Sequence, residues 1–269
     1  MPEHANSTCL VTGQPASLTL GQRRVRVFLA TGMLLLLAGA ATRIDCPVSR
    51  WCLAGNCPDA VADMLQVIEP FGNGLGVFTV LVAVWFLDPA RRRALARLAA
   101  CAYLPGLAAN LIKLAVVRTR PCAFDFRGDV WATFGGWFPM AAAGSEGQSF
   151  PSAHTATAVG LAVGLAWFYP RGRWFFATLA VLVGCQRVVS GFHFPSDVLA
   201  GGALGLLVAS SCTHIGVLRR VFNAIELCRP TPGRGRPRRA DAPASRDEPG
   251  DNTKRIGPSV AVQMRSGGR

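Results

Sequence analysis

The sequence is short of acidic residues: 15 Asp and Glu stand against 28 Lys and Arg, which gives a formal net charge of +13. No cluster of these carboxylates has the spacing of a Mg²⁺ or Ca²⁺ site. The four histidines and nine cysteines show no zinc-ligand spacing either. We therefore expect a protein that uses no metal and no other cofactor.

Short alternating apolar runs are also lacking, because the apolar half of the chain comes in long blocks. Such blocks are typical of transmembrane helices, which need about 20 apolar residues each. One block, at residues 155–169, is short enough to be a buried helix instead. We predict an all-α, polytopic membrane bundle of about six transmembrane helices, Val27–Thr42, Phe71–Leu87, Ala94–Val117, Thr155–Tyr169, Trp174–Val189 and Val198–Val217.

The composition predicts three parts of the chain. Residues 1–24 are expected to form a cytoplasmic N-terminal segment, residues 25–222 the transmembrane domain, and residues 223–269 a disordered, basic cytoplasmic tail. The tail is rich in Pro, Gly, Arg and Asp and has no apolar period to bury. An alternative for the first block is a cleaved secretory signal, since Ala38–Ala41 resembles a cleavage site.

The arginines gather in alternate connections between the blocks. Lys and Arg accumulate in short cytoplasmic loops, so both termini are predicted to be cytoplasmic and residues 43–70, 118–154 and 190–197 to face outward. We expect a bacterial inner membrane protein whose outward side is the periplasm. Anionic lipid headgroups then explain the basic charge, and no nucleic acid partner is expected. The arginines concerned are Arg23, Arg24, Arg26, Arg91, Arg92, Arg93, Arg97, Arg171, Arg173, Arg219 and Arg220.

Four cysteines fall in the outward connections: Cys46, Cys52, Cys57 and Cys122. Disulfides can form on that side of the membrane. Two bridges among four cysteines have three possible pairings, which the sequence does not distinguish. Four free thiols are the alternative.

Polar residues at the outward ends of the blocks form three clusters, and polar groups at membrane depth are costly enough to suggest function. The first cluster is Lys113 and Arg120. Seven residues are about two helical turns, so we predict both side chains on one helix face, with Pro121 ending the span. If this pair stood alone, basic side chains reaching toward lipid headgroups would be the simpler interpretation.

The second cluster, Ser152, Ala153 and His154, opens a predicted helix. Helix N-termini attract phosphate through their unpaired backbone N–H groups, and His154 is placed to donate a proton to a departing oxygen. A helix cap and an interfacial polar residue are the alternatives.

The third cluster contains Arg187, His193 and Asp197. A carboxylate four residues from a histidine can bond one ring nitrogen and leave the other as a nucleophile. The alternative is a capping Asp beside an unrelated His. Because all three clusters lie in one leaflet, together they indicate a cationic site for a phosphate group.

These segments resemble the three signature motifs of the type 2 phosphatidic acid phosphatase (PAP2) superfamily, K-x6-RP, PSGH and SR-x5-H-x3-D. The resemblance covers roughly residues 60–217 and implies a PAP2-like bundle. It implies that His193 attacks phosphorus to form a phosphohistidine, that Asp197 orients His193, and that His154 protonates the leaving oxygen. It also implies a set of phosphate-binding groups: Lys113, Arg120, Ser152, Arg187 and the backbone amide of Ala153.

The chain departs from these motifs at two positions. Ala153 replaces the usual Gly, which is tolerated if its φ is negative. Gln186 replaces the usual Ser before Arg187, and an amide can still donate to an oxyanion. Neither change removes a catalytic group.

The resemblance implies a membrane phosphatase that hydrolyses a lipid phosphate or pyrophosphate at the outer membrane face. Candidate substrates are phosphatidate, phosphatidylglycerophosphate, polyprenyl pyrophosphate and the phosphates of lipid A. One alternative is a lipid phosphotransferase with the same histidine intermediate, and another is a non-catalytic protein that binds lipid phosphate. The sequence leaves the oligomeric state open.

Overall fold

The computed structural model describes residues 19–138 and 144–227. The predicted N-terminal segment up to residue 18 and the predicted tail from residue 228 lie outside these residues. In the described part the chain forms the α-helices α1 (Leu20–Leu53), α2 (Asp59–Ile68), α3 (Gly74–Leu87), α4 (Leu95–Lys113), α5 (Ala153–Phe168), α6 (Arg173–Val189), α7 (Pro195–Thr213) and α8 (Gly216–Leu227). Five 3₁₀ turns connect them: η1 (Glu69–Gly72), η2 (Pro89–Ala94), η3 (Pro121–Ala123), η4 (Val130–Thr133) and η5 (Pro170–Gly172).

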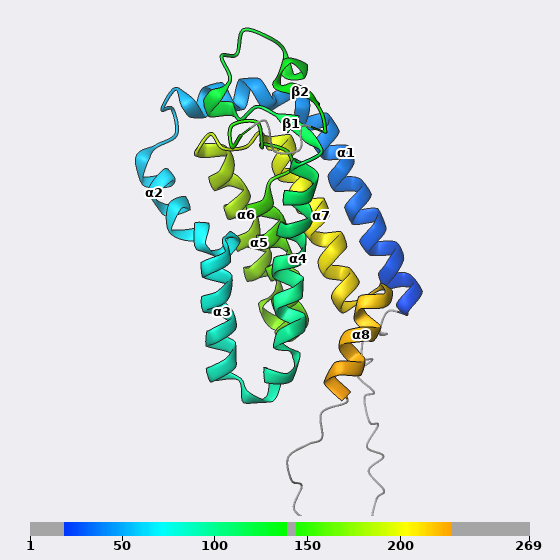
Figure 1. The fold of residues 1–269 in the computed structure, drawn as a ribbon. Helices are drawn as coiled ribbons and strands as arrows, with labels where there is room; N and C mark the ends of the chain where they lie inside the picture. Colours follow the sequence, from blue (N-terminus) through cyan, green and yellow to red (C-terminus); the bar gives the residue numbers. More distant parts are fainter. Residues whose placement is uncertain (1–18, 139–143, 228–269) are drawn as a thin grey trace, which may run out of the picture. The chain divides into compact units, whose positions relative to one another are not determined.

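Helix α5 is the centre of the bundle. It packs against α4, α6 and α7, while α1 lies along α7 and α3 lies beside α4 (Figure 1). Small residues permit this close packing: a Cβ added at Gly160 of α5 would lie 2.1 Å from the carbonyl oxygen of Cys101 in α4. Helices in membranes commonly associate through such small-residue contacts.

Each predicted span overlaps a helix of the structure. By length and composition, three described helical segments can cross a membrane: Leu20–Leu53, Pro89–Lys113 and Pro195–Thr213. A fourth crossing results if Asp59–Gly72 and Gly74–Leu87, which meet at a bend of 66°, are one broken span. The protein is thus a mostly helical membrane protein, and the count of six spans stays a prediction.

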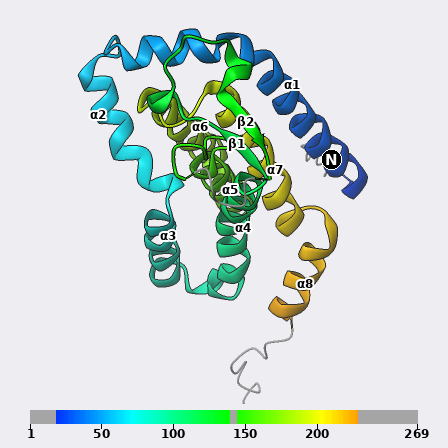
Figure 2. The ribbon, with the colours of Figure 1, turned by 45° about the horizontal axis from the view of Figure 1, so that its top comes forward.

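Helix α1 is longer than predicted, since it continues past Thr42 to Leu53. Its last part turns across the top of the bundle (Figure 2), and Pro47 lies inside this part. A proline within a helix removes a backbone hydrogen bond and bends the helix. The extension places Asp45, which the sequence assigned to a connection, among buried side chains.

The connection after α4 corrects one prediction. The helix ends at Lys113, and β1 (Val116–Arg118) pairs with β2 (Phe134–Trp137) in a small antiparallel sheet beside the helices. Lys113 and Arg120 therefore do not share a helix face. The physical reason is that the β-branched Val116 and Val117 suit a strand as well as a span.

Helix α8 extends the folded part beyond the predicted boundary at residue 222. Arg97, buried in α4, donates to both carboxylate oxygens of Glu226 at 2.9 Å and to Asn223 at 2.6 Å. The guanidinium also stacks 4.6 Å from the centre of the Trp167 ring. A planar guanidinium suits this paired geometry, so Arg97 fixes α8 to the end of the bundle that carries the arginine-rich connections.

Candidate active site

His193 lies in the turn between α6 and α7, where Gly191 adopts a positive φ of 69° that favours glycine. The ring is buried, and its Nδ1 lies 2.7 Å from the carbonyl oxygen of Ser149. Because a carbonyl oxygen only accepts, Nδ1 carries the proton and Nε2 keeps its lone pair. Burial, and next the charges of Lys113 and Arg120, hold the pKa of His193 well below its usual value. The ring is therefore neutral, with Nε2 available as a nucleophile.

Asp197 does not bond His193 directly, as the sequence led us to expect: its Oδ2 lies 3.9 Å from Nδ1 of the ring. The carboxylate instead accepts from the Ser149 hydroxyl at 2.6 Å and from the backbone N–H of Phe194 at 2.9 Å. Ser149 thus joins the pair, since its hydroxyl donates to Asp197 and its carbonyl accepts from His193.

The charges of Lys113, Arg120 and Arg187 all act on the His193 ring, although these residues come from different segments. Within the described residues, the side chain of Lys113 is buried and forms no hydrogen bond or ion pair, and the buried Nε of Arg120 has no partner. A buried cation such as Lys113 is costly without a counter-ion, whereas Arg187 has a carboxylate partner in Glu69. The cluster therefore fits an anion bound between these side chains.

The start of α5 supplies the remaining predicted residues. Ser152 is the N-cap, and its Oγ accepts from the Thr155 hydroxyl at 3.0 Å. Ala153 is the first helical residue and its φ is not positive, so it meets the condition under which it can replace glycine. The imidazole of His154 is partly exposed and lies within the electrostatic reach of Arg187, Lys113 and Arg120.

Gln186 has a different role from the one the sequence suggested. Its amide nitrogen donates to Ser190 Oγ at 2.8 Å, and its amide oxygen accepts from Arg187 Nε at 2.5 Å. The buried side chain therefore holds the guanidinium of Arg187 in place instead of donating to an oxyanion.

Arg118 is a buried residue that the sequence reasoning missed. It pairs with Asp197, donates to Asp45 Oδ2 and Ser196 Oγ at 2.7 Å each, and donates to Thr133 Oγ1 at 3.2 Å. Asp45 also accepts from the backbone N–H of Ser196 at 3.0 Å. This network ties α1 to the start of α7. The one signal in the sequence was a carboxylate, Asp45, three residues after the end of the predicted span Val27–Thr42.

Glu69, on η1, was also missed. Its Oε1 lies 3.0 Å from Arg187 and 3.6 Å from Nε2 of His154. The Glu69 carboxylate therefore lies close to both Arg187 and His154, the candidate proton donor.

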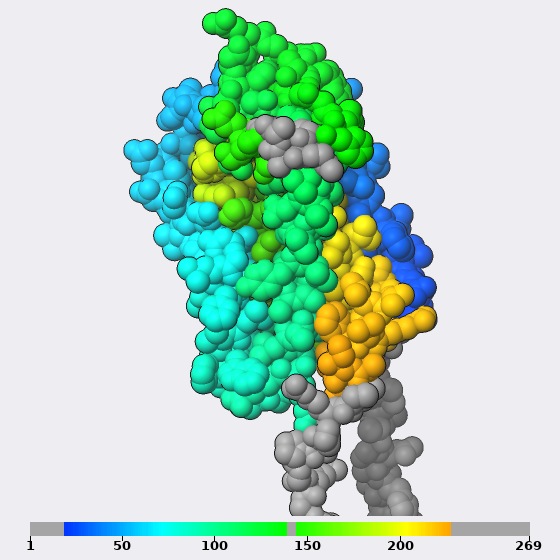
Figure 3. Space-filling model, in the orientation of Figure 1, coloured from blue at the N-terminus to red at the C-terminus, as the bar shows by residue number. Residues whose placement is uncertain are grey.

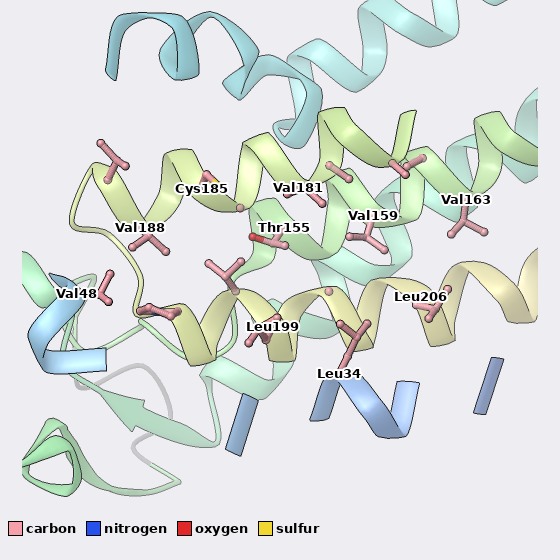
Figure 4. Close-up of a pocket in the computed structure, with 18 of the residues that line it drawn as sticks. Leu34, Val48, Thr155, Val159, Val163, Val181, Cys185, Val188, Leu199 and Leu206 are labelled. Carbon is pink, nitrogen blue, oxygen red and sulfur yellow. The ribbon is translucent and has the colours of Figure 1, made fainter. Parts of the chain in front are cut away.

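Two cavities of different character flank α5. An apolar groove of 760 Å³ lies between α1, α5, α6 and α7 (Figure 4), and its lining includes Leu34, Val48, Val159, Val188 and Leu206. The second, which we call the α3–α4 cavity, measures 460 Å³ and lies next to the candidate proton donor. It is lined by residues from η1, the start of α3, α4 and α5: Gly72, Asn73, Gly74, Tyr103, Asn110 and His154 among them. The face shown in Figure 3 is hollowed between the cyan α2–η1 segment and the green α4.

Among residues 19–138 and 144–227, no three His, Cys, Asp or Glu side chains gather as a metal site. Cys46, Cys52, Cys57 and Cys122 are free thiols in this structure, so no disulfide is formed among them.

Comparison with known proteins matches the PAP2 superfamily to residues 94–220. The lipid A 1-phosphatase of Rhizobium etli is 32% identical over 195 residues, which cover 65% of this chain and 79% of that protein. The lipid A 1-phosphatase of Rhizobium johnstonii is also 32% identical, over 65% of this chain and 75% of its own.

Two solved structures are more distant. Aquifex aeolicus LpxE is 20% identical with a TM-score of 0.46, covering 62% of this chain and 92% of its own. The PAP2-type phosphatidylglycerolphosphate phosphatase of Bacillus subtilis is 22% identical with a TM-score of 0.46. The match covers 69% of this chain and 91% of that chain.

The motifs and the helical membrane fold define a bacterial integral membrane phosphatase that acts on lipid phosphate. The chain belongs to the PAP2 superfamily.

Proposed function

We propose that this phosphatase hydrolyses a lipid phosphate monoester without a metal, through a phosphohistidine at His193, on the periplasmic face of the inner membrane. Lipid A 1-phosphate is the first substrate to test, because the relatives named for it match over most of their length. The supporting observation is the state of His193: its Nδ1 is bonded to the carbonyl of Ser149, and the charges of three cations act on the ring.

In the first step, Nε2 of His193 forms a bond to phosphorus while the bond from phosphorus to the leaving oxygen breaks. His154 gives its proton to that oxygen, so the lipid leaves as an alcohol. Lys113, Arg120, Arg187 and the start of α5 spread the charge of the nonbridging oxygens. The phosphorylated ring is positive, and Asp197 at 3.9 Å together with the Ser149 carbonyl stabilises it.

In the second step, His154 removes a proton from water, and the water oxygen attacks phosphorus as the bond to His193 breaks. Inorganic phosphate leaves, and both histidines return to their starting protonation states.

The test measures phosphate release from lipid A 1-phosphate by the purified protein in detergent. His193→Ala is expected to lose turnover by at least about 1,000-fold, since the covalent intermediate can no longer form. A chelator is expected to leave the activity of the wild type unchanged.

Retained turnover in a correctly folded His193→Ala protein would refute the nucleophile. Loss of activity with chelator, restored by a divalent cation, would refute the metal-free reaction. Phosphate release only after addition of an acceptor alcohol would indicate a phosphotransferase.

A further inference from the structure

The turn η1 begins with Glu69 and lies between α2 and α3, where the chain bends by 66° (Figure 1). A Cβ added at Gly72 of this turn would lie 2.8 Å from the backbone oxygen of His154 and 2.7 Å from a methyl carbon of Val183. The turn therefore packs closely against α5 and α6. This packing brings the carboxylate of Glu69 to the start of α5 and the end of α6, where His154 and Arg187 lie.

The carboxylate of Glu69 faces two groups of the candidate site. Its Oε1 forms an ion pair at 3.0 Å with Nη2 of Arg187 and lies 3.6 Å from Nε2 of His154. The second distance is longer than that of an N–H···O hydrogen bond. When His154 is protonated, the proton on Nε2 therefore stays available to another acceptor, while the carboxylate acts on the ring through its charge.

The charges around His154 have opposite effects on its protonation. Three cations, Arg187, Lys113 and Arg120, repel a positive charge on the imidazole. Among the described residues, Glu69 supplies the negative charge that attracts it. A general acid has to carry its proton before the leaving oxygen departs. The cations that favour phosphate binding thus oppose the protonated His154, and Glu69 offsets this effect.

We propose that Glu69 is a positioning residue of the reaction: its carboxylate keeps a proton on His154 beside the cationic phosphate site, and it holds Arg187 toward that site. The inference rests on the proposed function and adds the group that makes its proton donor effective. Gln186 accepts from Nε of Arg187 at 2.5 Å, so the guanidinium is held at two points. Glu69 acts through these side chains and needs no contact with the substrate.

The experiment compares two substrates that differ in their need for a proton donor. The alcohol of a lipid phosphate is a poor leaving group without a proton, whereas the nitrophenolate of 4-nitrophenyl phosphate leaves as an anion. Glu69→Gln keeps an oxygen that accepts from Arg187 and removes the charge beside His154. The ratio of kcat/KM for lipid A 1-phosphate to kcat/KM for 4-nitrophenyl phosphate is expected to fall about tenfold, the effect of losing one opposite charge at this range. Phosphatidate replaces lipid A 1-phosphate if the wild type does not hydrolyse the latter.

Three further variants are measured in the same way. Glu69→Asp keeps the charge, and its ratio is expected to recover in part. Asp63→Asn changes an exposed carboxylate of α2, and its ratio is expected to equal that of the wild type. In His154→Ala the ratio is expected to be low already, and adding Glu69→Gln should lower it no further, because the proton donor is absent.

The results separate the role of Glu69 from the proposed function. A lower ratio in Glu69→Gln that vanishes in the His154→Ala background supports the positioning role. An unchanged ratio, or one that falls equally with and without His154, overturns this role and leaves the lipid phosphatase assignment standing. A wild type that releases phosphate from neither lipid A 1-phosphate nor phosphatidate overturns the proposed function, and the role of Glu69 with it.

Discussion

Ser149 shows how a residue outside the three motifs completes a predicted site. The spacing of His193 and Asp197 predicted a direct bond between them, but the contact runs through the hydroxyl and carbonyl of Ser149. Ser149 precedes Asp197 by 48 residues. Residue spacing predicts contacts only between neighbours within one helix or turn. It therefore could not predict the contact of Ser149 with His193 and Asp197.

The neutral state of His193 predicts a particular pH dependence. Burial and three nearby cations lower the pKa of the ring, so protonation is disfavoured as the pH falls through about 6.5. Arg120→Gln removes one cation, which should raise the pKa of His193 and weaken phosphate binding. We expect the ratio of kcat/KM in this variant to that in the wild type to decrease as the pH is lowered from about 8 to about 5.

The ratio is the quantity to measure because the ionisation of the substrate phosphate affects both proteins equally. Arg219→Gln is the control, because Arg219 lies in α8 and lines a different cavity, together with Arg23, Arg97 and His214. A ratio for Arg120→Gln that is low but constant with pH would show that Arg120 binds phosphate without setting the charge state of His193.

At the scale of elements, the sequence located the helices better than their ends. The long apolar blocks predicted the bounds of α5 and α6 to within a few residues. It did not show that α4 stops at Lys113, because Leu114, Val116 and Val117 continue the apolar run. Pairing with β2, a contact with a distant segment, decides that these residues form a strand.

The contact between α1 and α7 yields a prediction about stability. Asp45 is fully buried and pairs with Arg118 at 2.7 Å. Asp45→Asn removes the negative charge beside the buried Arg118. Breaking a buried ion pair by removing one partner lowers the free energy of unfolding by about 3 kcal/mol. We expect a clearly lower thermal unfolding midpoint in detergent. Because Asp45 touches the start of α7 and not the phosphate site, kcat should fall more than KM rises.

The matched control for this substitution is Asp63→Asn. Asp63 is an exposed carboxylate on α2 and has no ion pair among the described residues. Its unfolding midpoint should equal that of the wild type. Equal midpoints for all three proteins would show that the Asp45–Arg118 pair contributes nothing to the packing of α1.

At the scale of the whole molecule, the sequence did not predict what supports the candidate site. The charges of Lys113, Arg120 and Arg187 reach both His193 and His154. Asp45 and Glu69 could not be assigned to the site, since each lies in a segment without a motif. Their roles come from the bend of α1 and the break between α2 and α3, which depend on packing against distant helices.

The arginine distribution predicts the orientation of the molecule in the membrane. Cys122 is exposed in the connection after α4, on the site side, whereas the connections rich in arginine follow the opposite helix ends. Positive charge stays in the cytoplasm, so Cys122 should face the periplasm. A membrane-impermeant maleimide applied to cells with a permeabilised outer membrane should label the wild type more strongly than Cys122→Ser. If the difference appears only after the inner membrane is broken, the site faces the cytoplasm, and the phosphatase then acts on the inner leaflet.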